Sequence, residues 1–271
     1  MMRSLWTAAS GMKAQQLNID TISNNLANVN TTGYKKERLE FQDLLYETIQ
    51  RSANDGEGGG RPVNLQVGHG VRPIATFKNF STGNIETTEN PLDIAIDGKG
   101  FFAIENRNGE EVYTRNGSFK VSVIDDELML VTSDGYPVLG LDDEPIYIPE
   151  NVQIEDLTIT EDGILQYVDE DQEVQELDNQ IKIVQFANRA GLEAVGQGFY
   201  KMTPASGEPL YEADGEILNP SRLIQGALES SNVQVVEEMV KMIIAQRAYD
   251  INSKAIQTSD DMLATANQLK R

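Results

Sequence analysis

Two segments at opposite ends of the 271-residue chain repeat apolar residues every seven positions. In residues 5–29 the repeat consists of Leu5, Met12, Ile19 and Leu26, with Ala8, Gln15, Ile22 and Val29 three positions later. In residues 235–266 it consists of Val235, Met242, Tyr249, Ile256 and Leu263, with Ala245, Asn252, Ser259 and Ala266 three positions after the last four. A heptad repeat without proline predicts a helix with a narrow apolar seam that needs a partner helix. We therefore predict a long helix at each end, capped by Ser4 in the first and by Ser231 or Asn232 in the second. The alternative is two ordinary surface helices of a globular domain.

Between these ends, short alternating runs are separated by glycine turns. Residues 92–96 and 101–104 have the alternation or aromatic content of strands, and 181–186 and 198–200 add further strands. Residues 112–121 predict a hairpin because Asn116-Gly117 suits the positive φ angles of a type I′ turn. No strand–helix–strand rhythm occurs, so we expect an α+β fold with a mainly antiparallel β body.

The same patterns divide the chain. We expect residues 1–33 and 232–271 to form a terminal coiled-coil domain. Residues 34–75 should form an extended linker, although the mixed composition of 34–53 is also compatible with a helix, and residues 54–61 are rich in glycine. Residues 76–231 should form a β-rich outer domain, with a further cluster inserted around 141–186.

The net charge of −21 is unevenly distributed. Residues 54–221 hold ten basic and thirty-two acidic residues, whereas both ends are close to neutral. This balance argues against binding nucleic acid or an anionic membrane surface, since both need basic side chains. Neutral ends can pack together in many copies, while acidic surface is best left in solvent; acidity that only aids solubility is the other interpretation.

Composition also limits the compartment and the chemistry. The chain has no cysteine, so no disulfide framework is expected. Its N-terminus lacks the apolar core of a signal peptide, and no run approaches the roughly 20 apolar residues of a membrane span. Composition alone therefore favours the cytosol.

Few residues suggest catalysis. His69, the only histidine, lies between two glycines and reads as a turn residue, and no Gly-x-Ser-x-Gly motif is present. The glycines of residues 56–60 are not followed by the Lys-Ser/Thr of a phosphate loop. Acidic runs occur at 125–127, 142–144 and 169–171, and paired acids are what a glycosidase uses. These runs read as solvated turns, and none fits a calcium loop. We predict no catalytic, cofactor-binding or metal-binding residue.

One polar run is unusual for a helix. Asparagine occupies positions 24, 25, 28 and 30, and its low helix propensity makes a helix there less stable by about 2 kcal/mol than one with alanine at these positions. Such a cost suggests hydrogen bonds to neighbouring segments, for which Gln246, Arg247 and Asn252 are candidate partners. We predict an assembly interface that combines this run with the heptad positions: Leu5, Met12, Ile19, Ile22, Asn24, Asn25, Leu26, Asn28, Val235, Met242, Arg247, Tyr249, Ile256 and Leu263.

Several of these stretches resemble a known family. Residues 23–35, Ser-Asn-Asn-Leu-Ala-Asn-Val-Asn-Thr-Thr-Gly-Tyr-Lys, are similar to the N-terminal signature of the bacterial flagellar rod and hook proteins. Residues 227–233 and 246–256 resemble the C-terminal signature, and residues 98–102 and 113–119 the middle domain. Residues 4–6, 41–46 and 66–73 are most similar to the distal rod members of the family. Residues 122–129 depart from the short turn usual in the family.

The resemblance implies a helical tube, with both termini in an inner coiled-coil layer around an export channel and the β domains outside. It implies that residues 46–65 are the rod-type segment linked to rigidity. Implied partners are further copies of the chain, proximal rod proteins, the hook protein, rod-surrounding rings and the flagellar type III export apparatus, without direct membrane insertion. Export without a cleaved signal peptide would place the protein in the cell envelope or periplasm. A proximal rod subunit, a hook subunit and a secreted acidic carbohydrate-active enzyme remain the alternatives.

Overall fold

The structure, a computed structural model, describes residues 2–52, 63–124, 127–149, 152, 157–168, 174–214 and 219–269. The chain forms two compact units. The helix–ribbon unit comprises Met1–Ala27, Glu37–Lys78 and Gln234–Arg271, and the β unit comprises residues 28–36 and 79–233.

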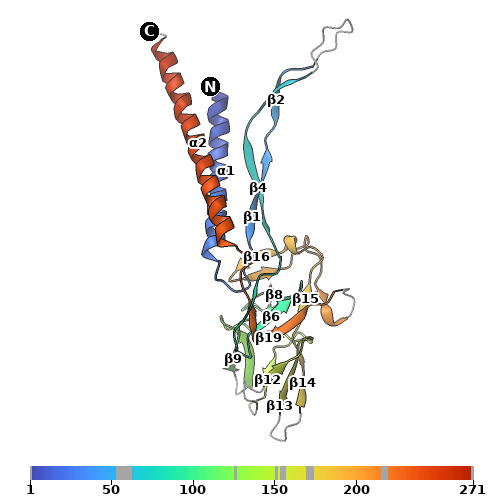
Figure 1. The fold of residues 1–271 in the computed structure, drawn as a ribbon. Coiled ribbons are helices and arrows are strands. Elements are labelled where there is room, and N and C mark those ends of the chain that lie inside the picture. Colours follow the sequence, from blue (N-terminus) through green and yellow to red (C-terminus); the bar gives the residue numbers. More distant parts are fainter. Residues whose placement is uncertain are drawn as a thin grey trace. The chain divides into compact units, whose positions relative to one another are not determined.

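Two long helices dominate the helix–ribbon unit. Helix α1 spans Met2–Ala27 and helix α2 spans Val235–Gln268, and they lie side by side (Figure 1). The helices confirm the heptad prediction, but their caps differ from it. Because α1 begins before Ser4, that residue lies inside the helix, and Gln234 precedes α2 without a side-chain cap bond. Glu237 and Glu238 still give the first turn of α2 the charge that a helix dipole favours.

A two-stranded ribbon completes this unit. Strand β1, Glu37–Asp43, pairs antiparallel with β4, Val71–Lys78, and β2, Tyr46–Gln50, pairs with β3, Leu65–Gly68. The segment that we expected as a linker thus holds most of four paired strands, and the described residues of the mixed stretch, 34–52, contain β1 and β2 and no helix. An isolated ribbon is marginal in water, and here it contacts α1 through β1 and β4. The glycine-rich stretch at 54–61, in the middle of the predicted rod-type segment, lies outside the described residues.

The β unit is antiparallel in every pairing of its described strands, which confirms the expected β-rich body. Its largest sheet has six strands, in the order β16 (Glu193–Gly196), β17 (Phe199–Lys201), β8 (Glu111–Thr114), β7 (Phe101–Glu105), β15 (Ile183–Gln185) and β18 (Leu210–Tyr211). Two sheets have three strands each: β11 (Tyr147–Ile148), β10 (Glu127–Thr132) and β9 (Phe119–Ile124); and β12 (Leu157–Ile159), β13 (Ile164–Val168) and β14 (Val174–Gln180). Two further pairs join β19 (Arg222–Gln225) to β6 (Ile94–Asp97) and β20 (Ala227–Glu229) to β5 (Ile85–Thr87). Short 3-10 helices span Arg189–Gly191 and Glu212–Asp214.

The alternating runs supply the core of the β unit. One cluster of buried apolar residues draws on β6, β7, β9, β10, β12 and β13 and includes Ile94, Ile96, Phe102, Phe119, Leu130, Leu157 and Leu165. A second, aromatic cluster contains Phe80, Phe101, Tyr113, Phe186 and Tyr200, several of them in edge-to-face pairs. Both clusters bury surface that a β body of this size needs for stability.

The predicted hairpin at 112–121 is wrong. Strand β8 pairs with β7 and β17, whereas β9 pairs with β10, so the strands on either side of Asn116-Gly117 separate into different sheets. Gly117 is required for a different reason: a Cβ there would lie 1.7 Å from the carbonyl oxygen of Ile94. The glycine allows two backbones to approach closely instead of making a type I′ turn.

Candidate assembly surface

Small and polar side chains form the contact between the two terminal helices. The Oγ atoms of Ser4 and Ser259 are 3.2 Å apart, and a Cβ added to Gly11 would lie 2.9 Å from Nδ2 of Asn252. Further along, Asn25 Nδ2 donates to Glu238 Oε2 at 3.2 Å. These contacts advance by multiples of seven in both helices, in opposite directions, so the pair is antiparallel with a heptad register.

The contact between the two helices does not fully bury the large apolar heptad residues. Leu5, Met12, Ile19 and Leu26 of the first repeat are only half-buried, although Ile22 is buried. In α2 the half-buried heptad residues are Met242, Ile256 and Leu263, and Val235 and Tyr249 are exposed. The heptad pattern thus predicted the helices correctly, but the apolar seam itself is not closed within one chain.

Helix α2 carries a second apolar face that is still more exposed. Val236, Val240 and Ile244 follow one another at four-residue spacing and are 76%, 50% and 61% exposed, and Ile251 continues the face at 67%. Trp6 of α1 is also exposed. Single exposed apolar residues are ordinary on protein surfaces, whereas a contiguous row on a helix is typical of an interaction surface.

Asn25 joins three elements of the helix–ribbon unit. Its side chain is 1% exposed, and besides its bond to Glu238 it pairs with the backbone of Glu37, donating to the carbonyl at 2.7 Å and accepting from the N–H at 2.9 Å. Lys241 Nζ in turn donates to Oε1 of the buried Glu238 at 2.9 Å. The cost of an asparagine in α1 is therefore offset by bonds to β1 and α2.

The other predicted polar residues have different surroundings. Asn252 faces Gly11 rather than the asparagine run, and Arg247, Gln246 and Asn24 are exposed. Asn28 lies just after α1, where its Oδ1 accepts from Thr31 Oγ1 at 3.2 Å. The role of these positions in assembly stays a prediction.

Replacing Asn25 with aspartate should destabilise the helix–ribbon unit by about 2–4 kcal/mol, because a second carboxylate would face the buried Glu238. Urea unfolding followed by far-UV circular dichroism measures the loss. Adding Glu238→Gln should recover part of it by restoring a donor between the two side chains. A loss no greater than that of the exposed control Asn24→Asp would contradict the role of Asn25.

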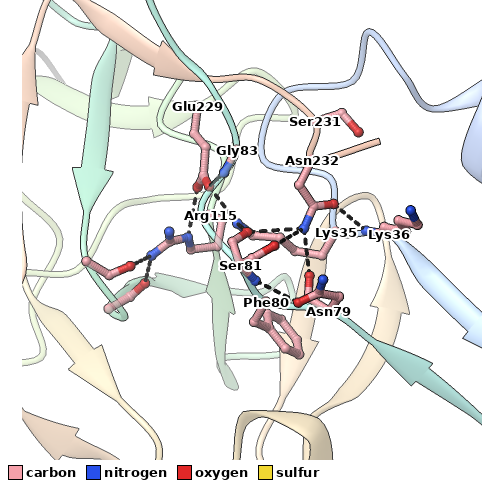
Figure 2. Close-up of polar contacts among 12 residues, drawn as sticks. Lys35, Lys36, Asn79, Phe80, Ser81, Gly83, Arg115, Glu229, Ser231 and Asn232 are labelled. Carbon is pink, nitrogen blue, oxygen red and sulfur yellow. Dashed lines mark hydrogen bonds and ion pairs between the residues drawn. The ribbon is translucent and has the colours of Figure 1, made fainter. Parts of the chain in front are cut away.

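Charged side chains from three distant parts of the sequence meet in the β unit (Figure 2). Lys35 and Glu229 are each 1% exposed, and Lys35 Nζ lies 2.6 Å from Glu229 Oε1. Arg115 Nε donates to the other carboxylate oxygen at 2.9 Å, and its Nη1 donates to the carbonyls of Gly98 and Gly100. The N–H of Gly83 adds a bond to Glu229 at 2.7 Å. One buried carboxylate thus holds two cations, and we call these three side chains the Glu229 cluster.

The backbone around the cluster is shaped to admit it. Gly33 has φ +68°, and a Cβ there would lie 2.8 Å from the carbonyl carbon of Arg115. Asn232, which we had expected as a helix cap, instead bridges two segments of the β unit. Its Oδ1 accepts from the N–H of Lys36 at 2.7 Å, and its Nδ2 donates to the carbonyl of Asn79 at 2.8 Å (Figure 2). The segments before β1 and before α2 are therefore built into the β unit.

Burial and charge act in opposite directions within the cluster. Burial, with Arg115, lowers the pKa of Lys35 to about 8 despite its bond to Glu229. Burial alone would raise the pKa of Glu229, but Arg115 and Lys35 hold it below its ordinary value. Sequence reasoning missed this cluster, because the three charges lie far apart in sequence and no periodicity links them.

Because the pKa of Lys35 is lowered, the free energy of unfolding should change with pH in the alkaline range. Above pH 8 the folded lysine loses its proton, while the unfolded lysine keeps it until about pH 10.5. The unfolded state then binds more protons, so this residue's contribution to stability rises between pH 8 and 10.5. Comparing urea unfolding of the wild type with Lys35→Met from pH 7 to 10 should show the wild type gaining about 2–3 kcal/mol relative to the variant. A difference that stays constant with pH would contradict the shift.

The described part of the chain shows no group of three or more histidine, aspartate or glutamate side chains placed to hold a metal ion. Neither helix, over its described residues, is long and apolar enough to cross a membrane. His69 lies in the short connection between β3 and β4, with Nε2 3.7 Å from Glu47 Oε2, and Glu47 also pairs with Arg3 at 2.7 Å. Of the predicted acidic runs, 169–171 and most of 125–127 lie outside the described residues.

Comparison with known proteins accounts for this arrangement. Residues 5–35 match the model of flagella basal body rod proteins, residues 95–167 the D1 domain of the flagellar hook proteins FlgE/F/G, and residues 224–269 the C-terminal domain of the basal body rod proteins FlgEFG. The flagellar basal-body rod protein FlgG of Borreliella burgdorferi is 51% identical over the full length of both chains. The FlgG proteins of Buchnera aphidicola and Caulobacter vibrioides are each 43% identical over 99% of this chain and all of their own.

Paired terminal helices and an antiparallel β unit, in a chain matched at both ends and in the middle, define a structural protein of the flagellar axis rather than an enzyme. The chain belongs to the FlgG family of flagellar basal-body rod proteins.

Proposed function

We propose that the chain is a structural subunit of the distal rod of the flagellar basal body. Many copies would polymerise into a rigid helical tube that transmits motor torque to the hook and encloses the export channel. The observation that carries the proposal is the apolar surface that both terminal helices leave uncovered, along the heptad residues and along Val236, Val240 and Ile244. Helices with such faces gain stability by packing against further helices.

In this proposal the terminal segments, 1–33 and 232–271, form an inner coiled-coil layer. Each helix pair approaches closely through Ser4, Gly11 and Asn25, while the larger apolar side chains pack against other copies. The acidic β-rich residues 76–231 face outward, with residues 34–75 between the two layers. Partners at the ends of the tube would be the proximal rod and hook proteins, with rod-surrounding rings outside and the type III export apparatus delivering subunits to the cell envelope.

A proximal rod subunit or a hook subunit is the second candidate, since the matched family models are named for hook and basal body rod proteins together. The names and full-length similarity of the FlgG relatives favour the distal rod.

The proposal predicts that the purified chain, concentrated from micromolar to near-millimolar, forms sedimenting straight tubes. Sedimentation velocity with negative-stain electron microscopy is the measurement. Expression in a flagellated bacterium from which the gene for its own FlgG has been deleted should restore rods of normal length and motility. A chain that stays monomeric at every concentration and leaves such a strain without distal rods would contradict the proposal.

A further inference from the structure

A second buried lysine lies in the β unit, away from the surfaces described above. Lys182, between β14 and β15, is 1% exposed, and its Nζ lies 4.5 Å from the centroid of the Tyr211 ring. Two carboxylates reach it: Oε1 of Glu111 lies 2.9 Å from Nζ, and Oδ1 of Asp143 contacts it directly. The Glu111 oxygen is itself buried.

The turn that presents Asp143 is held in an uncommon conformation. Asp143 has φ +62°, in the left-handed region that few residues other than glycine adopt, and its N–H donates to the carbonyl of Gly140 at 3.2 Å. Gly140 forms a bridge with Ile181, next to Lys182. Burial and the nearby Glu111 carboxylate raise the pKa of Tyr113. A turn residue in the left-handed region that presents its carboxylate to a buried lysine points to chemistry between the two.

We propose that Lys182 and Asp143 form an intramolecular isopeptide bond, with Glu111 as the general base. Glu111 relays a proton from the lysine ammonium to a carboxylate oxygen of Asp143, and the free Nζ attacks Cγ of the resulting neutral carboxyl group. An N–C bond forms and a C–O bond breaks, and the departing oxygen leaves as water with two protons relayed from Nζ through Glu111. The ammonium and the carboxylate become one neutral amide and one water, and nothing is oxidised or reduced. This chemistry is independent of the proposed function.

Two features make the condensation feasible. Reactants held in contact reach effective molarities of about 10⁵–10⁸ M, which lowers the barrier to attack. Burial of Nζ removes the water that would otherwise stabilise the ammonium, while the Asp143 side chain, 69% exposed, leaves the product water a route to solvent.

The resting state is nevertheless an ion pair. Burial lowers the pKa of Lys182, but hydrogen bonds with Asp143 and Glu111 raise it more, so the net pKa lies above that of a free lysine. The reactive state, a neutral amine beside a protonated carboxyl group, holds the same number of protons as the resting ion pair, so the bond should form slowly and at a rate that changes little between pH 7 and pH 9.

The test is the intact mass of the purified full-length chain, incubated for days at pH 7 and pH 9. The wild type should lose about 18 Da, one water, in most molecules, at similar rates at the two pH values. Tryptic mapping should then join the peptide that contains Lys182 to the one that contains Asp143. Asp143→Ala and Glu111→Gln should retain the full mass, whereas the neighbouring control Asp142→Ala should behave like the wild type.

Two results would overturn the proposal. One is a wild-type chain that keeps its full mass under both conditions. The other is a cross-link that joins Lys182 to Glu111, or one that forms as fast in Glu111→Gln as in the wild type. Circular dichroism of each variant establishes that the β unit is folded. If Asp143→Ala does not fold, Glu111→Gln, which keeps the shape of the side chain, provides the test of the proposal.

Discussion

Replacing Glu229 with glutamine is expected to lower the free energy of unfolding of the β unit by about 3–5 kcal/mol. The substitution keeps the shape of the side chain but leaves Lys35 and Arg115 as buried cations without a counter-charge. Unpaired buried charge costs more than the loss of an ordinary hydrogen bond. Urea unfolding of the full chain, followed by near-UV circular dichroism, measures the loss.

A matched control lies on the neighbouring strand. Glu86 in β5 is exposed, and Glu86→Gln should change stability by less than about 0.5 kcal/mol. Combining Glu229→Gln with Lys35→Met removes one of the two unpaired cations. The loss of unfolding free energy in the double variant should therefore be smaller, by about 1–2 kcal/mol or more, than the sum of the losses in the two single variants. Additive losses would show that the Glu229 cluster does not act as a unit.

Replacing both Val240 and Ile244 with lysine is expected to abolish assembly without unfolding the monomer. Both residues are exposed, so the charges cost little in the single chain. If another copy covers this face, each subunit loses the burial of two apolar side chains, about 3 kcal/mol or more in total, and gains two desolvated charges. A loss of about 3 kcal/mol raises the concentration needed for assembly by roughly 100-fold, which sedimentation velocity would detect.

The conservative variant Val240→Ile keeps the face apolar and serves as the control, because its assembly should match the wild type. Circular dichroism and urea unfolding of the lysine variant should give the wild-type helix content and midpoint. If the lysine variant assembles like the wild type, this face of α2 is not a contact between copies.

The two helices could be predicted because a heptad repeat is local information. Val240 and Ile244 do not belong to that repeat, and the repeat could not show that Gly11 and the two serines lie at the contact between the helices. The antiparallel pairing of the β body could also be predicted, since alternating runs between glycine turns favour antiparallel strands.

The features that sequence reasoning predicted wrongly, or did not predict, depend on tertiary contacts. Asn116-Gly117 carries the turn chemistry of a hairpin, but close packing against Ile94 overrides it. Asn232 has the composition of a helix cap, yet its amide binds Lys36 and Asn79. The Glu229 cluster joins residues up to 194 positions apart, and no local pattern records a pairing of that range.

The account rests on the claim that other copies of the chain cover the exposed apolar faces of the terminal helices. Since the chain has no cysteine, the single variants Val240→Cys and Ile251→Cys can report on this directly, with Ser133→Cys on the β unit as the control. Maleimide should modify all three thiols rapidly in the monomer. In assembled rods the account predicts that the two helix positions become at least ten times slower to react, which marks burial by about 1.4 kcal/mol or more. Rods in which the thiols at positions 240 and 251 react as fast as in the monomer would contradict it.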